Sequence, residues 1–198
     1  MLIPINQAAA WLLQGKIVAI PTDTVYGLAV SIHNVHAIQN LYSFKKRPLD
    51  KPFVVQIATP ADLYNYLIEI PYHLPKLMDK YWPGPLTIVV PVNTDLIPSI
   101  ARSHLNSCAF RIPNCKPTLD LLRLSGPLLV PSANITGEEP ALTAQDVENK
   151  FGSDFPVIEG ESLSSNLPST IIEYANGQWK LLREGSITWT QLLEDLKD

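Results

Sequence analysis

The sequence predicts an α/β domain built on a mixed β-sheet with helices packed against it. Apolar residues make up 46% of the 198 residues and charged residues 17%, which is typical of a folded globular chain. Strand-like and helix-like segments alternate without a regular strand–helix–strand rhythm, and one β-hairpin is evident. The length suits one domain, and the sequence contains no repeat or linker. We therefore expect a single domain over residues 1–198.

Helix-forming segments begin at capping residues and carry apolar side chains at helical spacing. Asn6 and Asn34 can each accept a hydrogen bond from a first-turn N–H group. Thr59 with Asp62 forms a capping box, and Thr143-Ala-Gln-Asp146 forms a second one. The expected helices cover residues 6–13, 35–44, a short stretch from 59, 74–81, 117–124, 143–151 and 188–196.

Strand-forming segments are short apolar runs bounded by proline, glycine or polar residues. The expected strands cover residues 16–20, 53–57, 86–90, 108–112, 128–130, 170–174 and 179–182. Asn176-Gly177 lies between the last two runs, and this pair is typical of a tight hairpin turn. We therefore expect those two strands to form a hairpin.

The charge balance and the cysteine pattern exclude several classes of protein. Lys and Arg total 15 against 19 Asp and Glu, so the net charge of −4 argues against nucleic-acid binding through a broadly basic surface. Cys108 and Cys115 fit neither a disulfide framework nor a zinc site, which indicates a reducing compartment. No run of about 18 apolar residues exists, and residues 1–15 lack a basic leader region. We expect a cytoplasmic protein that does not contact a membrane.

Polar segments directly follow two of the predicted strands, at the place where open α/β sheets bind ligands. The segments are Pro21-Thr-Asp-Thr-Val-Tyr-Gly27 and Pro131-Ser-Ala-Asn-Ile-Thr-Gly137. Each also fits an ordinary capped turn. Ser132 and Asn134 are suited to orient a polar ligand, although no Gly-x-Ser-x-Gly elbow marks a covalent nucleophile.

Cations gather in one short segment and recur singly in two apolar strands. The segment contains Lys45, Lys46, Arg47 and Lys51. It fits either a solvated turn or a clamp for a polyphosphate or carboxylate. Arg111 and Arg183 each need an anionic partner, which a ligand or a neighbouring acid could supply. Together the residues indicate a site for an anionic, hydroxyl-rich small molecule such as a nucleotide.

Seven short motifs, in order between about residues 16 and 187, resemble those of the YrdC family of TsaC-type threonylcarbamoyl-AMP synthases. The motifs are Pro21-Thr-Asp-Thr-Val-Tyr-Gly-Leu28, Lys45-x-Arg47-Pro48, Trp82-Pro-Gly-Pro-Leu-Thr87, Phe110-Arg-Ile-Pro113, Pro131-Ser-Ala-Asn134 with Gly137, Pro168-Ser-Thr-Ile171 and Leu182-Arg-x-Gly185. The resemblance implies a single YrdC-like domain, with a twisted mixed sheet flanked by helices around a positively charged cavity. It implies no additional C-terminal domain of the kind that longer members carry.

The activity that the resemblance implies is a nucleotidyl transfer. L-threonine, bicarbonate and ATP would yield threonylcarbamoyl-adenylate and pyrophosphate, with Mg²⁺ carried in by ATP and no metal held by the protein. A transferase of the Kae1/TsaD type would then modify position 37 of tRNA, and a transient contact with tRNA or double-stranded RNA is expected.

The resemblance also assigns roles to individual residues. The implied catalytic set is Lys45, Arg47, Ser132 and Asn134. The implied ATP-binding set is Arg47, Lys51, Ser107, Asn134 and Arg183. The implied threonine-binding set is Thr22, Thr24, Gln56, Arg111, Ser132 and Ser169.

The sequence departs from the family pattern at four positions, and two other functions stay open. The departures are Lys46 where glycine is frequent, Lys51 where asparagine is frequent, Gln56 where histidine is frequent and Thr136 in place of serine. The first alternative is a YciO-like paralogue that uses another acyl or carbamoyl substrate. The second is a non-catalytic module that binds double-stranded RNA or tRNA.

Overall fold

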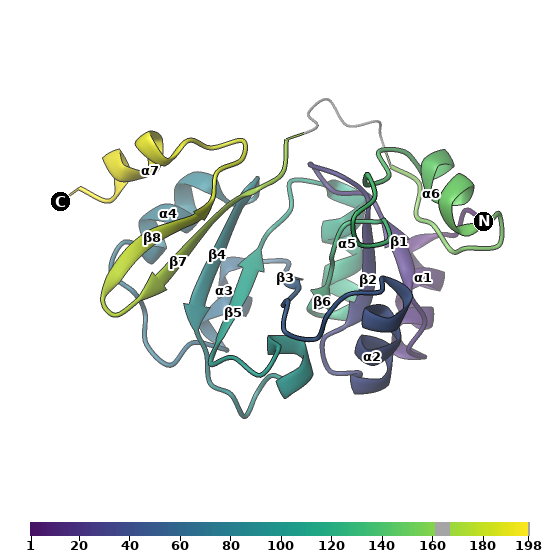
Figure 1. Cartoon of the computed structure of the whole chain (residues 1–198), viewed down its shortest axis with the longest axis horizontal. Coiled ribbons are helices and arrows are strands. Elements are labelled where there is room, and N and C mark those ends of the chain that lie inside the picture. The colour runs from purple at the N-terminus through teal and green to yellow at the C-terminus, as the bar shows by residue number, and fades with distance from the viewer. Residues whose placement is uncertain (161–166, 198) are drawn as a thin grey trace.

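A mixed β-sheet runs through the molecule, as the sequence predicts (Figure 1). The computed structural model describes residues 1–160 and 167–197. Within them the sheet has eight strands in the order β1-β2-β6-β3-β5-β4-β7-β8. The strands are β1 (Val18–Ile20), β2 (Gly27–Ser31), β3 (Val54–Gln56), β4 (Leu86–Pro91), β5 (Ser107–Arg111), β6 (Leu128–Leu129), β7 (Thr170–Ala175) and β8 (Gln178–Arg183). The pairs β3–β5 and β4–β7 are parallel, and the other neighbouring pairs are antiparallel.

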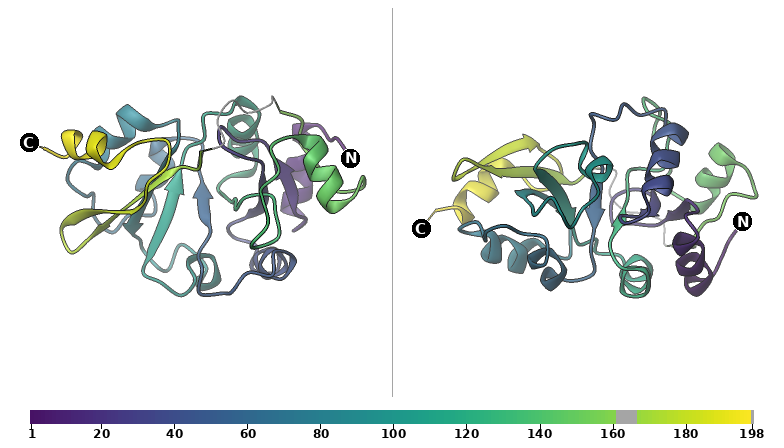
Figure 2. Two further views of the ribbon diagram at one scale, coloured as in Figure 1. Left: turned by 45° about the horizontal axis from the view of Figure 1, so that its top comes forward. Right: turned by 90° about the horizontal axis from the view of Figure 1, so that it is seen from below.

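Helices lie against both halves of the sheet (Figures 1 and 2). They are α1 (Ile5–Leu13), α2 (Val35–Phe44), α3 (Pro60–Tyr64), α4 (Leu74–Tyr81), α5 (Lys116–Ser125), α6 (Ala144–Phe151) and α7 (Trp189–Asp195), with a 3₁₀ turn η1 (Ser99–Arg102). In Figure 1, α1, α2, α5 and α6 gather around β1, β2 and β6, whereas α4 and α7 lie beside the β7–β8 hairpin. The two ends of the chain lie at opposite ends of the molecule.

Most of the capping residues expected from the sequence are confirmed. The Asn34 Oδ1 atom accepts a hydrogen bond of 2.9 Å from the Ala37 N–H group at the start of α2. The predicted role of Asn6 is wrong, because α1 begins at Ile5 with Pro4 in the N-cap position, and no side chain caps it. Pro4 precedes the helix in an extended conformation, so Asn6 already lies in the first turn, where it is no longer the capping residue.

The expected hairpin is confirmed at Asn176-Gly177, which joins β7 to β8. Both residues have positive φ angles, 53° and 76°, as the type I′ turn requires.

The strand β2 corrects the sequence prediction, which placed no strand at residues 27–31. All but the last of its residues are buried, so it shows no alternation of apolar and polar side chains by which a strand is usually found.

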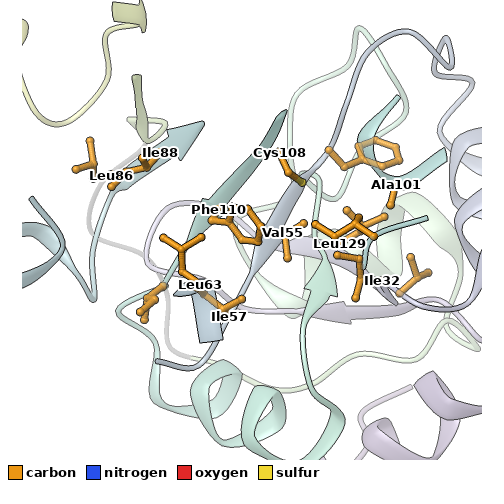
Figure 3. Close-up of a cluster of buried hydrophobic side chains, with 14 of the residues drawn as sticks. Ile32, Val55, Ile57, Leu63, Leu86, Ile88, Ala101, Cys108, Phe110 and Leu129 are labelled. Carbon is orange, nitrogen blue, oxygen red and sulfur yellow. The ribbon is translucent and has the colours of Figure 1, made fainter. Parts of the chain in front are cut away.

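The buried side chains form two clusters on the sheet. Figure 3 shows the larger one, in which Val55 of β3, Phe110 of β5 and Leu129 of β6 lie together. The smaller cluster joins α1 and α5 to β1 and β6. Parallel pairing of β3 with β5 places Gln56 and Arg111 opposite each other at the ends of two buried strands. The core therefore carries two polar side chains to the centre of the molecule.

Among residues 1–160 and 167–197, no helix is both long enough and apolar enough to cross a bilayer.

Asn34→Ala should lower the free energy of unfolding by about 1 kcal/mol, because it removes a helix cap. Urea denaturation followed by circular dichroism measures the change. Asn6→Ala is the matched control and should be neutral or slightly stabilising, since exposed Asn6 lies inside α1 and alanine favours a helix. Equal losses for both variants would contradict the assignment of the caps.

Candidate functional site

A cavity of about 450 Å³ lies beside the central strands. Its wall combines the β1–β2 connection, the segment from α2 into β3, the segment after β6, and residues of β4, β5, β7 and β8. The residues are Thr22, Thr24, Val25, Tyr26, Gly27, Arg47, Pro52, Phe53, Val54, Gln56, Thr87, Arg111, Val130, Pro131, Ser132, Glu139, Pro140, Pro168, Ser169, Ile171 and Arg183. Eight residues named from the sequence therefore share one wall. These are Thr22, Thr24, Arg47, Gln56, Arg111, Ser132, Ser169 and Arg183.

Arg111 is buried at the end of β5 and has a carboxylate partner within the protein. Its Nη2 atom pairs with Asp23, its Nη1 atom donates to Thr24 Oγ1 at 3.0 Å, and its Nε atom donates to the Gly84 carbonyl at 3.0 Å. The sequence left open whether a ligand or an acid would neutralise this arginine. Asp23 neutralises it, and the contacts of Arg111 hold the β1–β2 connection against β5.

Arg47 and Arg183 are different, because their partners in the described part of the chain are neutral. Arg47 donates from Nε to the Lys51 carbonyl at 2.9 Å and from Nη2 to the Pro52 carbonyl at 3.1 Å. Arg183 donates from Nη2 to the carbonyl of Ser169 at 2.8 Å and to its hydroxyl at 3.2 Å.

Burial lowers the pKa of both guanidinium groups, and for Arg183 the nearby Arg111 lowers the pKa further. Arg47 is partly buried and Arg183 is exposed, and an anion that enters the site stabilises both cations.

Gln56 has an unused acceptor on the cavity wall. The side chain is only 3% exposed, and its Oε1 atom has no hydrogen-bond partner among the described residues. Buried polar atoms are nearly always paired, and this oxygen is itself covered, so it meets a donor group of a ligand only if the amide turns toward the cavity. Beyond it, the fully buried Thr87 holds Ser169 through hydroxyl groups 2.8 Å apart.

Lys45 and Asn134 lie behind the loop that follows β6 and are not among the residues that line the cavity. The Lys45 ammonium donates to the carbonyl groups of Ser132 and Asn134, the latter at 2.6 Å. The Ser132 hydroxyl donates to Asn134 Oδ1 at 2.6 Å. These bonds fix Ser132 on the cavity wall, while the roles of Lys45 and Asn134 in catalysis stay predictions.

Lys51 and Ser107 also lie outside the cavity lining. The Lys51 side chain is exposed, and its backbone carbonyl accepts the bond from Arg47. Ser107 begins β5, where it is paired with Pro91 of β4. Their roles in binding ATP stay predictions.

The sequence analysis did not assign several residues of the wall to the site. Thr87 is the last residue of one of the seven motifs, so the sequence did contain a pattern that marks it. Glu139 belongs to none of these motifs. Gly27 also belongs to a motif, and the structure explains the need for glycine there. A Cβ atom at this position would lie 2.3 Å from Val130 Cγ1, so any side chain would push β2 away from the segment after β6.

In the ranges 1–160 and 167–197, no group of three or more His, Cys, Asp or Glu residues could hold a metal ion.

Comparison with known proteins gives one family. The family model Sua5/YciO/YrdC, described as "Telomere recombination", matches residues 10–185. A protein of Bacillus subtilis named threonylcarbamoyl-AMP synthase is 35% identical over 95% of this chain, which corresponds to 55% of that protein. A protein of the same name from Buchnera aphidicola is 34% identical over 85% of this chain and 88% of its own length.

A solved structure agrees with the family match. The crystal structure of Pyrococcus abyssi Sua5 complexed with L-threonine superposes with a TM-score of 0.91 at 32% identity, covering 97% of this chain and 57% of that chain. This chain thus spans about half the length of the Bacillus and Pyrococcus proteins.

The Lys45 ammonium should make the stability of the protein depend on pH. Burial and the neighbouring Arg47 lower the pKa of Lys45 from 10.5 to about 8. Between these two values the unfolded chain still binds the proton that the folded chain has released, so the free energy of unfolding rises with pH.

Urea denaturation of wild type and Lys45→Met between pH 7 and 10.5 measures this contribution, because the other groups titrate in both proteins. The difference in unfolding free energy, wild type minus variant, should increase by roughly 2 to 3 kcal/mol across the range. A difference that stays constant would show that Lys45 keeps an ordinary pKa.

Proposed function

The chain belongs to the Sua5/YciO/YrdC family, and we propose that it is a threonylcarbamoyl-AMP synthase that uses L-threonine, bicarbonate and ATP. The observation that carries the proposal is the pair Arg47 and Arg183, which line one cavity without a carboxylate partner among the described residues. The resemblance of the motifs and the names of the relatives agree with this reading. The whole reaction, with its substrates and partners, is part of the proposal.

The chemistry requires negative charge to be concentrated in a small space. The threonine amine combines with bicarbonate to form a carbamate and releases water. A carbamate oxygen then bonds to the α-phosphorus of ATP while the bond from that phosphorus to the pyrophosphate oxygen breaks. Fixed cations and correct positioning are most of what such a transfer needs, and no covalent nucleophile is required.

The residues of the wall suit the two ends of such a complex. Arg47 and Arg183 present cations for the phosphates, and Ser132 lies on the same wall with its hydroxyl held by Asn134. On the proposed threonine side, the Gln56 amide lines the cavity, and its unpaired oxygen meets an ammonium or hydroxyl donor once the amide turns toward the ligand. Mg²⁺ enters as part of the ATP substrate, neutralising phosphate charge.

The product is a mixed anhydride of a carbamic acid and AMP, which is reactive toward amines. We propose that a transferase of the Kae1/TsaD type consumes it to modify position 37 of tRNA in the cytoplasm, with a transient tRNA or double-stranded RNA contact. The enzyme is a nucleotidyltransferase in this proposal.

The decisive assay incubates the purified protein with ATP, Mg²⁺, L-threonine and bicarbonate, and detects threonylcarbamoyl-adenylate and pyrophosphate by mass spectrometry. Product that forms only when both threonine and bicarbonate are present supports the proposal. A folded protein that binds ATP and makes no product in this assay contradicts it.

Arg47→Ala should lower the rate of product formation by at least about 100-fold, because it removes a cation from the transition state. Arg123→Ala is the control: this arginine is exposed on α5, pairs with Asp120, and should leave the rate unchanged. Circular dichroism checks that both variants fold. An Arg47→Ala variant that turns over like wild type would show that Arg47 plays no part in the reaction.

Gln56→Met should raise the KM for threonine by about tenfold and leave the melting temperature unchanged or higher. The variant removes an acceptor intended for the ligand, and it also removes an unpaired buried oxygen from the folded protein. Gln145→Met, on the exposed face of α6, is the control. If the threonine KM of Gln56→Met equals that of wild type, the Gln56 oxygen does not contact threonine.

A further inference from the structure

We propose that Tyr42 is a positioning residue for ATP binding, acting through Arg47, and that Ser103 supports it. This inference rests on the proposed function, because it assumes that Arg47 binds the phosphates of ATP. Neither Tyr42 nor Ser103 lines the cavity, so neither is a catalytic residue.

The link between Tyr42 and Arg47 is a shared backbone acceptor. The Lys51 carbonyl accepts one hydrogen bond from the Tyr42 hydroxyl at 3.2 Å and a second from Arg47 Nε at 2.9 Å. A carbonyl oxygen has two lone pairs, and the two donors occupy both. The Tyr42 hydroxyl therefore sets the direction of the carbonyl that holds the guanidinium group.

Tyr42 and Arg47 are also connected through an aromatic ring of the cavity wall. The Tyr42 ring stacks on Phe53 with 4.3 Å between centroids, and the Arg47 guanidinium lies 5.1 Å from the centroid of Phe53. Phe53 and Arg47 line the cavity, whereas Tyr42 is only 2% exposed behind them. The Nε and Nη2 bonds leave the Nη1 group of Arg47 without a partner among the described residues, free to meet an anion.

Ser103 orients the Tyr42 hydroxyl from the other side. The two hydroxyl oxygens are 2.9 Å apart, and Tyr42 donates to Lys51, so Ser103 must donate to Tyr42. Ser103 lies just after η1 with a positive φ of 50°. The preceding Arg102 is buried and donates to three backbone carbonyls of the surrounding loop, including that of Ile97 at 3.0 Å. The position of Ser103 is therefore fixed by the loop as a whole.

Calorimetric titration with Mg²⁺-ATP, and separately with L-threonine, tests the proposal on the full chain. Tyr42→Phe keeps the ring stack and removes only the hydroxyl, so it should weaken ATP binding by about three- to tenfold, the effect of one neutral hydrogen bond. Threonine affinity should stay within about twofold of wild type, and Ser103→Ala should weaken ATP binding less than Tyr42→Phe does.

Tyr81→Phe is the matched control for general destabilisation. It also loses a hydrogen-bonded hydroxyl, here to Asp195 at 2.5 Å in the contact between α4 and α7, and should not change ATP affinity. Arg47→Lys supplies a second test, since lysine has no counterpart of the Nε donor. In that background Tyr42→Phe should weaken ATP binding by less than about twofold, because the link it removes is already broken.

The outcomes distinguish a failure of the proposed role of Tyr42 from a failure of the proposed function. A selective loss of ATP affinity that disappears in the Arg47→Lys background supports the role of Tyr42. Unchanged ATP affinity in Tyr42→Phe, an equal loss for ATP and threonine, or the same loss in both backgrounds overturns it. A wild-type protein that binds no ATP with or without threonine overturns the proposed function, and the role of Tyr42 with it.

Discussion

The buried Arg111 guanidinium connects three parts of the chain, and the shape of the cavity depends on it. It joins the end of β5 to Asp23 and Thr24 in the β1–β2 connection and to Gly84 before β4. A charge held in an apolar sheet is tolerated only when its donors are paired. These pairings therefore determine where the first and the central strands stand relative to one another, and the cavity lies between them.

The arginines of the cavity divide into two kinds according to their partners. Arg111 has its counterion within the protein and works as part of the scaffold. Arg47 and Arg183 are held by carbonyl and hydroxyl groups, which orient a guanidinium group without neutralising it. An anion-binding site needs cations that are held in place but not paired with an acid of the protein. The negative charge of the ligand then neutralises them.

A layer of residues behind the wall sets the positions of the groups that face the ligand. Lys45 holds the loop that carries Ser132, and Tyr42 holds the carbonyl to which Arg47 is bound. Both lie in α2 or directly at its end, so one helix supports two parts of the wall. The motif that contains Lys45 and Arg47 thus places one cation behind the wall and the other on it.

The sequence by itself determined the local features of this protein: most helix caps and the Asn176-Gly177 hairpin, together with eight of the 21 residues that line the cavity. These depend on hydrogen bonds and spacings within a few residues, which a sequence displays directly. Only the tertiary structure decided that Asp23 pairs with Arg111, 88 residues away, that Lys45 faces the Ser132 loop, 87 residues away, and that Gln56 keeps a free oxygen. It also decided that residues 27–31 form a strand, because a fully buried strand is defined by its neighbours in the sheet.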